Sequence, residues 1–205
     1  MLNRWIQQAY LSPQKRSVLR RMFLMTRPFP FLYLRDFFVP EQLQRVRRSV
    51  LRLPLTERSC DLYQLRQGDD LAGVSDPLLR EFYALFTSDE FCEYITSLTG
   101  ISLTRHIDMS AALYTKTDYL LPHDDDLEGR KIAYVVNLSQ QFTARDGGQL
   151  QFFSGKKHHP LRVSRSYVPQ WNSLVLFRVA PGYYHQVHEV FSSKKRLALS
   201  GWLHG

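Results

Sequence analysis

The sequence predicts an α+β protein in which a jelly-roll, or double-stranded β-helix, follows a set of supporting N-terminal helices. Helical periodicity and capping residues dominate the first 100 residues, whereas almost every later segment reads as a β-strand. Helices segregated from a run of antiparallel strands are typical of this architecture. The chain has 205 residues, of which 44% are hydrophobic and 13% aromatic, enough for one domain with a sizeable, β-rich core.

The N-terminal half is expected to be mainly helical. Helices are predicted at residues 3–11, 14–25, 40–51, 78–86 and 87–100. Pro40 suits a first helical turn, and Leu43 and Val46 begin an apolar face behind it. Thr87 and Glu90 have the spacing of a capping box, which predicts that the last of these helices begins there.

The C-terminal half is expected to consist of strands. They are predicted at residues 102–116, 131–138, 149–153, 161–168, 173–179, 185–190 and 196–203, and one further strand is predicted earlier in the chain, at residues 31–34. Gly147 and Gly148 predict a turn just before the run at 149–153.

One domain is expected over residues 1–205, with 1–30 as a basic helical segment and 31–205 as helices plus the jelly-roll core. Cys60 and Cys92 lie far apart and match no metal-binding or disulfide spacing, which favours a reducing compartment. No run approaches the length of a transmembrane span, so no membrane partner is expected.

The net charge of +8 depends strongly on the N-terminus, where residues 1–27 carry six basic side chains and no acidic one. The favoured interpretation is an amphipathic helix that packs on the barrel and exposes a solvated basic face. The segment also fits an organellar presequence or a patch that contacts nucleic acid or ribosomes. The compartment therefore stays open: cytoplasm or nucleus in a eukaryote, cytoplasm otherwise, or an organelle.

The strongest functional pattern is His123-Asp124-Asp125, followed by His185 and then Arg196. Two imidazoles and one carboxylate can occupy one face of an iron(II) ion and leave three positions open. In His-x-Asp, both side chains lie on the same side of an extended segment. A guanidinium eleven residues after the second histidine can hold the distal carboxylate of a keto acid in a bidentate pair.

Three other histidine patterns compete with this one. His106-Ile107-Asp108 is a second His-x-Asp, but its neighbours read as continuous strand, which favours a non-ligand strand histidine. His188 lies three residues after His185 and would face the other side of a strand, so only one of them can join the ligands. We choose His185, because it leaves the longer gap to Arg196. His158-His159 reads as a hairpin tip that meets solvent.

Several motifs together resemble the ribosomal-protein prolyl hydroxylases, which belong to the 2-oxoglutarate- and Fe(II)-dependent oxygenases. Residues 123–134 are similar to the iron-binding strand of that family. Further similar stretches, in the family's order, are Ile107-Asp108-Met109-Ser110, Asp146-Gly147-Gly148-Gln149-Leu150, Pro169-Gln170-Trp171-Asn172-Ser173-Leu174-Val175, His185-Gln186-Val187 and Ser200-Gly201-Trp202-Leu203-His204-Gly205. In this resemblance His106-x-Asp108 falls on a non-ligand strand, and His185 carries the family's His-Gln-Val context.

The resemblance implies a role for each site residue. The iron ligands would be His123, Asp125 and His185. The distal carboxylate of 2-oxoglutarate would be held by Arg196 and Tyr114. Asn137 stands where close relatives have a tyrosine that contacts the co-substrate. The implied activity is a dioxygenase reaction that consumes O2 and 2-oxoglutarate, is stimulated by ascorbate, and hydroxylates a prolyl residue in a small-subunit ribosomal protein. The acidic segment Asp124-Asp126-Glu128 would attract a basic substrate peptide.

Two alternatives remain at this point. One is an oxygenase of the same superfamily that acts on another protein or on nucleic acid, for which the basic charge is suited. The other is a non-catalytic β-barrel binding module, although all three ligands and the arginine are present.

The family's eukaryotic members carry a second β-barrel domain after the motif that here ends at Gly205. We therefore expect either the catalytic part of a longer protein or a single-domain member.

Overall fold

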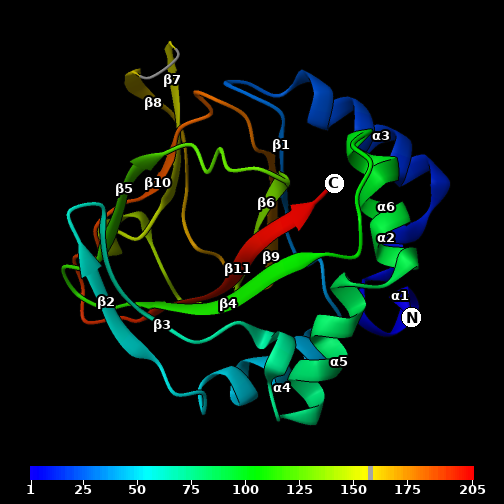
Figure 1. The fold of residues 1–205 in the computed structure, drawn as a ribbon, viewed down its shortest axis with the longest axis horizontal. Helices are drawn as coiled ribbons and strands as arrows, with labels where there is room; N and C mark the ends of the chain where they lie inside the picture. The colour runs from blue at the N-terminus through cyan, green and yellow to red at the C-terminus, as the bar shows by residue number, and fades with distance from the viewer. Residues whose placement is uncertain (157–158) are drawn as a thin grey trace.

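The computed structural model describes residues 1–156 and 159–205. A curled sheet forms one side of the molecule, and the helices gather along its other side (Figure 1). The fold class is the predicted one, because helices support an antiparallel, jelly-roll-like sheet. His158, expected at a hairpin tip, lies outside the described residues.

Six α-helices and two short 3-10 helices precede or connect the strands in the described part of the chain. They are α1 (Leu2–Trp5), α2 (Gln8–Leu11), α3 (Pro13–Met25), α4 (Pro40–Val50), η1 (Leu71–Gly73), α5 (Pro77–Phe86), α6 (Asp89–Thr99) and η2 (Ala144–Asp146). The helix predicted at 3–11 is divided at Ile6, which is extended and forms an isolated bridge with Phe38. Ser88 rather than Thr87 caps α6, since its side chain accepts a hydrogen bond from the Phe91 amide. The predicted capping box was therefore wrong by one residue.

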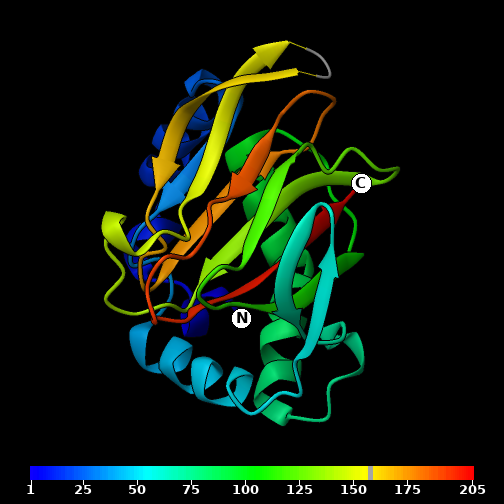
Figure 2. The same cartoon turned by 90° about the vertical axis from the view of Figure 1, so that its left-hand side faces the viewer.

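The strands form a single, strongly curled sheet. They are β1 (Phe31–Leu34), β2 (Thr56–Cys60), β3 (Tyr63–Gln67), β4 (Ile107–Tyr114), β5 (Tyr119–His123), β6 (Arg130–Asn137), β7 (Leu150–Lys156), β8 (His159–Tyr167), β9 (Ser173–Arg178), β10 (His185–Val187) and β11 (Arg196–His204). Their order is β1-β9-β6-β11-β4-β3-β5-β10-β7-β8, with β2 paired to β3. Strand β3 pairs with β4 through one end and with β5 through the other, so it joins the two halves of the sheet (Figure 2).

Strand register decides which side chains face the helices and which face the barrel interior. On β4 and β11, Met109 and Leu203 are buried in the large core cluster that includes residues from the helices. Tyr114 and Arg196 pair across the same two strands. Because side chains alternate along a strand, these two residues point to the opposite face, into the barrel.

The structure adds three strands that the sequence analysis did not predict, β2, β3 and β5. Strand β2 is exposed along its whole length, and β5 has no fully buried residue, so neither shows the apolar alternation that marks a strand. The strand predicted at 102–116 is also shorter, because only Ile107–Tyr114 is regular.

The basic N-terminal segment packs against the rest of the chain. Helix α3 buries Leu19 and Phe23 in the large core cluster. Arg4 forms an ion pair with Glu81, and Arg16 lies 5.1 Å from the centre of the Tyr94 ring. Helix α3 therefore packs one side on the core, as expected, but its outer side exposes Met22 and Met25 as well as basic residues. A basic face that contacts organellar import machinery or nucleic acid stays a prediction. None of the helices in the described residues is long and apolar enough to cross a membrane.

Candidate active site

His123, Asp125 and His185 meet at the edge shared by β5 and β10. His123 ends β5 and pairs directly with His185 on β10. The Asp125 carboxylate lies between the two rings, with Oδ1 at 3.3 Å from His123 Nε2 and Oδ2 at 3.1 Å from His185 Nε2. All three side chains offer ligand atoms within 4.8 Å of one another. The structure therefore brings together the three residues that the sequence named as metal ligands.

The way in which Asp125 reaches this position differs from the sequence argument. Asp125 lies beyond the end of β5 and has a φ of 58°, in the left-handed region. The carboxylate therefore meets the imidazoles through a turn rather than through the two-residue alternation of a strand. Asp124 holds this turn, because its Oδ2 accepts a hydrogen bond of 3.0 Å from the Gly182 amide.

Backbone carbonyls orient both histidine rings. His123 Nδ1 lies 2.8 Å from the Leu121 oxygen, and His185 Nδ1 lies 3.4 Å from the Tyr183 oxygen. With Nδ1–H donating to a carbonyl, each ring can bind a metal through Nε2 once that nitrogen is unprotonated. Both Nε2 atoms face Asp125, so the donor set of two imidazoles and one carboxylate converges on one point.

The pKa values of Asp125, His185 and His123 depend strongly on one another. Burial alone would raise the pKa of the Asp125 carboxyl, but the neighbouring His185 and His123 rings lower that pKa well below its usual range. Burial, reinforced by the nearby His123, lowers the pKa of His185. Burial also acts to lower the pKa of His123, but the interactions with Asp125, the Leu121 carbonyl and Asp124 together outweigh burial and raise that pKa. A negative carboxylate and a neutral buried imidazole suit a divalent cation.

His188 takes no part in this group. Its amide donates to the Gln149 oxygen, and its ring packs against Phe191 at 5.1 Å between ring centres. Within the described residues its buried Nδ1 has no hydrogen-bond partner. Of the two histidines that competed in the sequence, His185 is the one beside Asp125.

Arg196 is a buried cation on the barrel-facing side of β11, only 2% exposed. Its Nε donates to the Gly148 oxygen at 2.9 Å, and its guanidinium carbon lies 4.9 Å from the centre of the Tyr114 ring. Among the described residues it forms no ion pair with a carboxylate. Burial lowers the pKa of the guanidinium, although arginine stays charged at neutral pH. An anion is the partner that such a cation lacks.

Gly148 makes this arrangement possible. It has a φ of +69°, which favours glycine, and a Cβ there would lie 3.1 Å from Arg196 Cδ. The predicted Gly147-Gly148 turn therefore does more than begin β7. It also presents the carbonyl that fixes the orientation of the arginine side chain.

Tyr114 and Asn137 lie on the same barrel-facing side but differ in their contacts. Burial raises the pKa of Tyr114, so its phenol stays protonated and can donate a hydrogen bond. Asn137 Nδ2 donates to Ser173 Oγ at 2.9 Å, while its buried Oδ1 has no partner within the described residues. Tyr114 lines the central cavity and Asn137 does not. A direct contact between Asn137 and a co-substrate stays a prediction.

A cavity of about 350 Å³ connects these residues, and its lining includes the two histidines, Asp125, Tyr114 and Arg196. The sequence analysis gave no role to four other lining residues, Leu62, Tyr63, Arg130 and Trp202. Leu62 and Tyr63 belong to the unpredicted β2–β3 hairpin, so no sequence signal pointed to them. Arg130 lies 3.3 Å from the centre of the Trp202 ring, and both stand within motifs that resembled the prolyl hydroxylases.

Comparison with known families agrees with this geometry. Residues 109–204 match the model of the 2OG-Fe(II) oxygenase superfamily. A Xenopus laevis protein named prolyl 3-hydroxylase OGFOD1 is 37% identical over 179 residues, covering 86% of this chain and 34% of the relative. The mouse protein of the same name is 38% identical over 177 residues, covering 85% of this chain and 31% of the relative. The chain therefore contains a 2OG-Fe(II) oxygenase domain. It spans about a third of the length of these relatives.

Solved structures of the same fold include a prolyl-4-hydroxylase from Pseudomonas putida, with a TM-score of 0.73, 17% identity, and coverage of 91% of this chain and 98% of that one. A prolyl hydroxylase from Trichoplax adhaerens, solved with a hypoxia inducible factor peptide fragment, has a TM-score of 0.68 and 17% identity, and covers 97% of this chain and 93% of that one. At this identity the comparison establishes the jelly-roll fold. The family implies Fe(II) as cofactor and 2-oxoglutarate and O2 as co-substrates. The two imidazoles and one carboxylate suit Fe(II), and Arg196, which has no carboxylate partner among the described residues, suits 2-oxoglutarate.

Proposed function

We propose that this chain is a 2-oxoglutarate- and Fe(II)-dependent dioxygenase that hydroxylates a prolyl residue, with a small-subunit ribosomal protein as substrate. The observation that carries the proposal is Arg196. It is a buried cation without a carboxylate partner among the described residues, and it lines the same cavity as the His-Asp-His group. 2-Oxoglutarate has a carboxylate at each end, so one end can pair with the guanidinium while the other faces a metal.

Each residue of the chain has a separate task in this reaction. His123, Asp125 and His185 would hold the iron, and the carbonyls behind the two rings keep Nε2 free for it. Arg196 and the protonated Tyr114 would bind and orient the distal carboxylate. When bound, the iron and 2-oxoglutarate supply the oxidising chemistry that places one atom of O2 on a C–H bond. The apolar walls of the cavity, among them Leu150 and Phe177, limit the access of water.

The names of the relatives support a prolyl substrate. The Xenopus and mouse proteins are named prolyl 3-hydroxylases, and so is a Drosophila melanogaster protein named sudestada1, which is 26% identical over the whole chain. The fold by itself does not decide the reaction. An epimerase, SnoN from nogalamycin biosynthesis, shares it with a TM-score of 0.65 and 12% identity. The substrate therefore has to be tested directly.

A basic ribosomal-protein segment is supported by the sequence motifs and by the local charge. Asp126 and Glu128 are exposed in the turn that leads to Arg130 at the cavity. They would attract a lysine- and arginine-rich peptide at short range. The net charge of +8 acts in the opposite direction. Local charges dominate in the bound complex, because charges beyond a Debye length of about 8 Å are screened at physiological salt.

The test is an incubation of the chain with Fe(II), 2-oxoglutarate, ascorbate, O2 and peptides from the decoding-centre proteins of the small ribosomal subunit. We expect succinate to form together with a mass increase of about 16 Da on proline, the mass of one oxygen atom. The Asp125→Ala protein, tested in parallel, should give neither product. If no peptide or intact ribosomal protein is modified while another protein is oxidised on proline, the ribosomal substrate is wrong; if only an oligonucleotide or a residue other than proline is oxidised, the prolyl assignment is wrong and the oxygenase assignment stands.

A further inference from the structure

A second group of two imidazoles and one carboxylate lies outside the candidate active site. His106, Asp108 and His204 offer one ligand atom each, and these atoms all lie within 4.8 Å of one another. His204 Nε2 is 2.9 Å from Asp108 Oδ2, and the His106 and His204 rings are 4.1 Å apart at their centres. The sequence treated His106-x-Asp108 as a non-ligand pattern. It could not show that the fold supplies a third residue, His204, from the far end of the chain.

The backbone around this group is well fixed. Thr104 donates to the His204 oxygen at 2.8 Å, and the His204 amide donates to the His106 oxygen at 3.1 Å. On the other side of His204, the Gly205 amide donates to the Gly129 oxygen at 3.1 Å. The ligand-bearing residues are therefore positioned by the main chain, and little ordering remains for a metal to impose.

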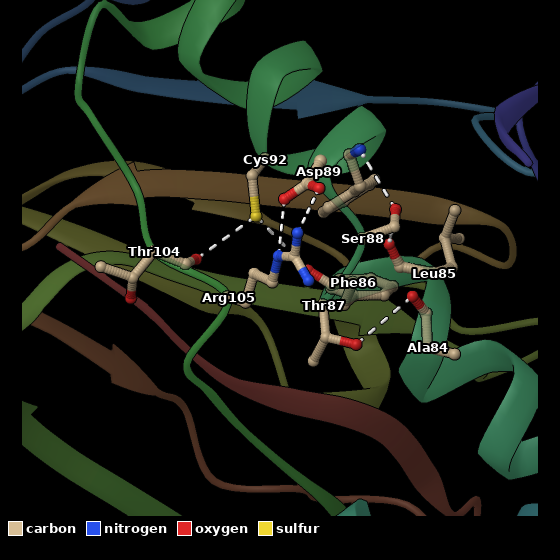
Figure 3. A network of polar contacts seen from close by, with 10 residues as sticks. Ala84, Leu85, Phe86, Thr87, Ser88, Asp89, Cys92, Thr104 and Arg105 are labelled. Atoms are coloured by element: carbon tan, nitrogen blue, oxygen red, sulfur yellow. Dashed lines mark hydrogen bonds and ion pairs between the residues drawn. The ribbon is translucent and has the colours of Figure 1, made fainter.

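The segment before His106 is anchored to helix α6 as well. Arg105 forms a two-pronged ion pair with Asp89, and Cys92 Sγ lies 3.3 Å from the Thr104 oxygen (Figure 3). The Arg105 guanidinium is thus turned toward α6 and neutralised there. It neither repels a cation from the neighbouring His106 nor competes for Asp108.

The group is distinct from the His123-Asp125-His185 site. Asp108 pairs with Trp202 near one end of the β4–β11 ladder, whereas Tyr114 pairs with Arg196 at the other end. None of His106, Asp108 and His204 is among the residues that line the cavity of the first site. Asp108 and His204 lie partly exposed, with side-chain exposures of 38% and 13%, and His106 is exposed. An ion in solution can therefore reach the group without entering the cavity.

We propose that His106, Asp108 and His204 form a second metal site, specific for a borderline transition metal of the zinc class. Two imidazoles and a carboxylate suit Zn²⁺, with water as a fourth ligand, and suit Mg²⁺ or Ca²⁺ poorly. Tetrahedral ligands at about 2.1 Å from zinc are roughly 3.4 Å apart, so a small rotation of the exposed His106 ring closes the site.

The predicted effect of this metal is structural. It would join the segment before β4 to the C-terminal end of β11, two parts of the chain about 100 residues apart. Because the metal binds the folded arrangement and not the separated residues, it should raise the melting temperature as its concentration increases. The proposal does not depend on the proposed prolyl hydroxylation.

The test is a titration of metal-free protein with Zn²⁺ by isothermal calorimetry, with thermal unfolding measured in parallel. We expect two equivalents of Zn²⁺ to bind the wild-type chain, because Zn²⁺ also fits the first group, His123-Asp125-His185. His185→Ala should leave one equivalent, which still raises the melting temperature. His106→Ala in that background should remove it, weakening binding by at least roughly 100-fold. With either variant, Mg²⁺ should neither bind in the calorimeter nor raise the melting temperature.

His188→Ala is the matched control, since it removes a partly buried histidine that belongs to neither group, and both equivalents should remain. The proposal is overturned if His106→Ala and Asp108→Asn both keep the stoichiometry and affinity of the wild-type protein. It is also overturned if His185→Ala binds no zinc. Should the first group bind no metal, a single equivalent abolished by His106→Ala would still support the second site while contradicting the proposed function.

Discussion

Arg196 and Tyr114 lie directly opposite each other on β11 and β4, and the guanidinium carbon is 4.9 Å from the centre of the phenol ring. The pair places a permanent cation and a hydroxyl donor side by side on one wall of the cavity. Neither group has a carboxylate to bind among the described residues. The pair therefore defines where the distal carboxylate of a co-substrate would bind.

Replacing Arg196 should weaken the binding of 2-oxoglutarate much more than the binding of metal. Truncating one partner of a buried charge pair costs on the order of 2–5 kcal/mol, or roughly 30- to several thousand-fold in affinity. Arg196→Lys keeps the charge but loses the bidentate geometry, and Arg196→Met loses both, so the loss should be larger for Met. Calorimetry with the metal-loaded protein measures both affinities. An unchanged 2-oxoglutarate affinity in Arg196→Met would rule out this role.

Tyr114→Phe should have a smaller effect of the same kind. The substitution removes only the hydroxyl, and one hydrogen bond to a charged group contributes about 1.5–3 kcal/mol, or roughly 10- to 150-fold in affinity. The ring and its contact with the guanidinium remain, so the free energy of unfolding should change little. Binding of 2-oxoglutarate and urea unfolding are the two measurements. If stability falls while affinity is preserved, Tyr114 supports the fold instead of the co-substrate.

The residues of the site were predictable from sequence to different degrees. His123, Asp125, His185 and Arg196 follow from ligand chemistry and from motif order, and neither requires knowledge of the fold. The β2–β3 hairpin was missed because β2 buries no residue, so its sequence carries no strand periodicity. His204 joined the second group only through the β4–β11 pairing, a contact across 96 residues that no local pattern encodes.

The fold class could be predicted from the sequence, but the backbone conformation at Asp125 could not. The fold class followed from the segregation of helices and strands, which is a property of the whole chain. The left-handed turn at Asp125 was not expected, because aspartate adopts positive φ only occasionally. Here the Gly182 amide, 58 residues away in sequence, holds the neighbouring Asp124. Local propensity could not reveal that interaction.

The two histidines of the β10 region should differ sharply when replaced. His185→Ala removes one of three ligands and should weaken Fe(II) binding by more than roughly 100-fold, since even supporting partners of a ligand contribute 10–100-fold. His188→Ala should leave iron affinity and 2-oxoglutarate turnover near wild-type values. Iron-dependent release of succinate measures turnover. Loss of activity in His188→Ala with normal activity in His185→Ala would reverse the ligand assignment.

Asn172 should be essential for stability although it lies away from the cavity. It is 1% exposed and has a φ of 58°, and its side chain bonds both to the Phe38 amide at 2.9 Å and to the Phe38 oxygen at 2.8 Å. It thereby ties the turn before β9 to the segment that leads into α4. Two buried hydrogen bonds contribute about 1 kcal/mol each, and an alanine in the left-handed region adds about 1–2 kcal/mol of strain.

Asn172→Ala is therefore expected to lower the free energy of unfolding by about 3–4 kcal/mol. Asn172→Gly is the matched variant, because glycine adopts positive φ without strain and loses only the side-chain bonds. It should cost about 2 kcal/mol in the same urea unfolding experiment. The affinity of the remaining folded protein for iron and 2-oxoglutarate should be unchanged in both variants. Equal losses for alanine and glycine would show that the hydrogen bonds, and not the backbone conformation, account for the whole effect.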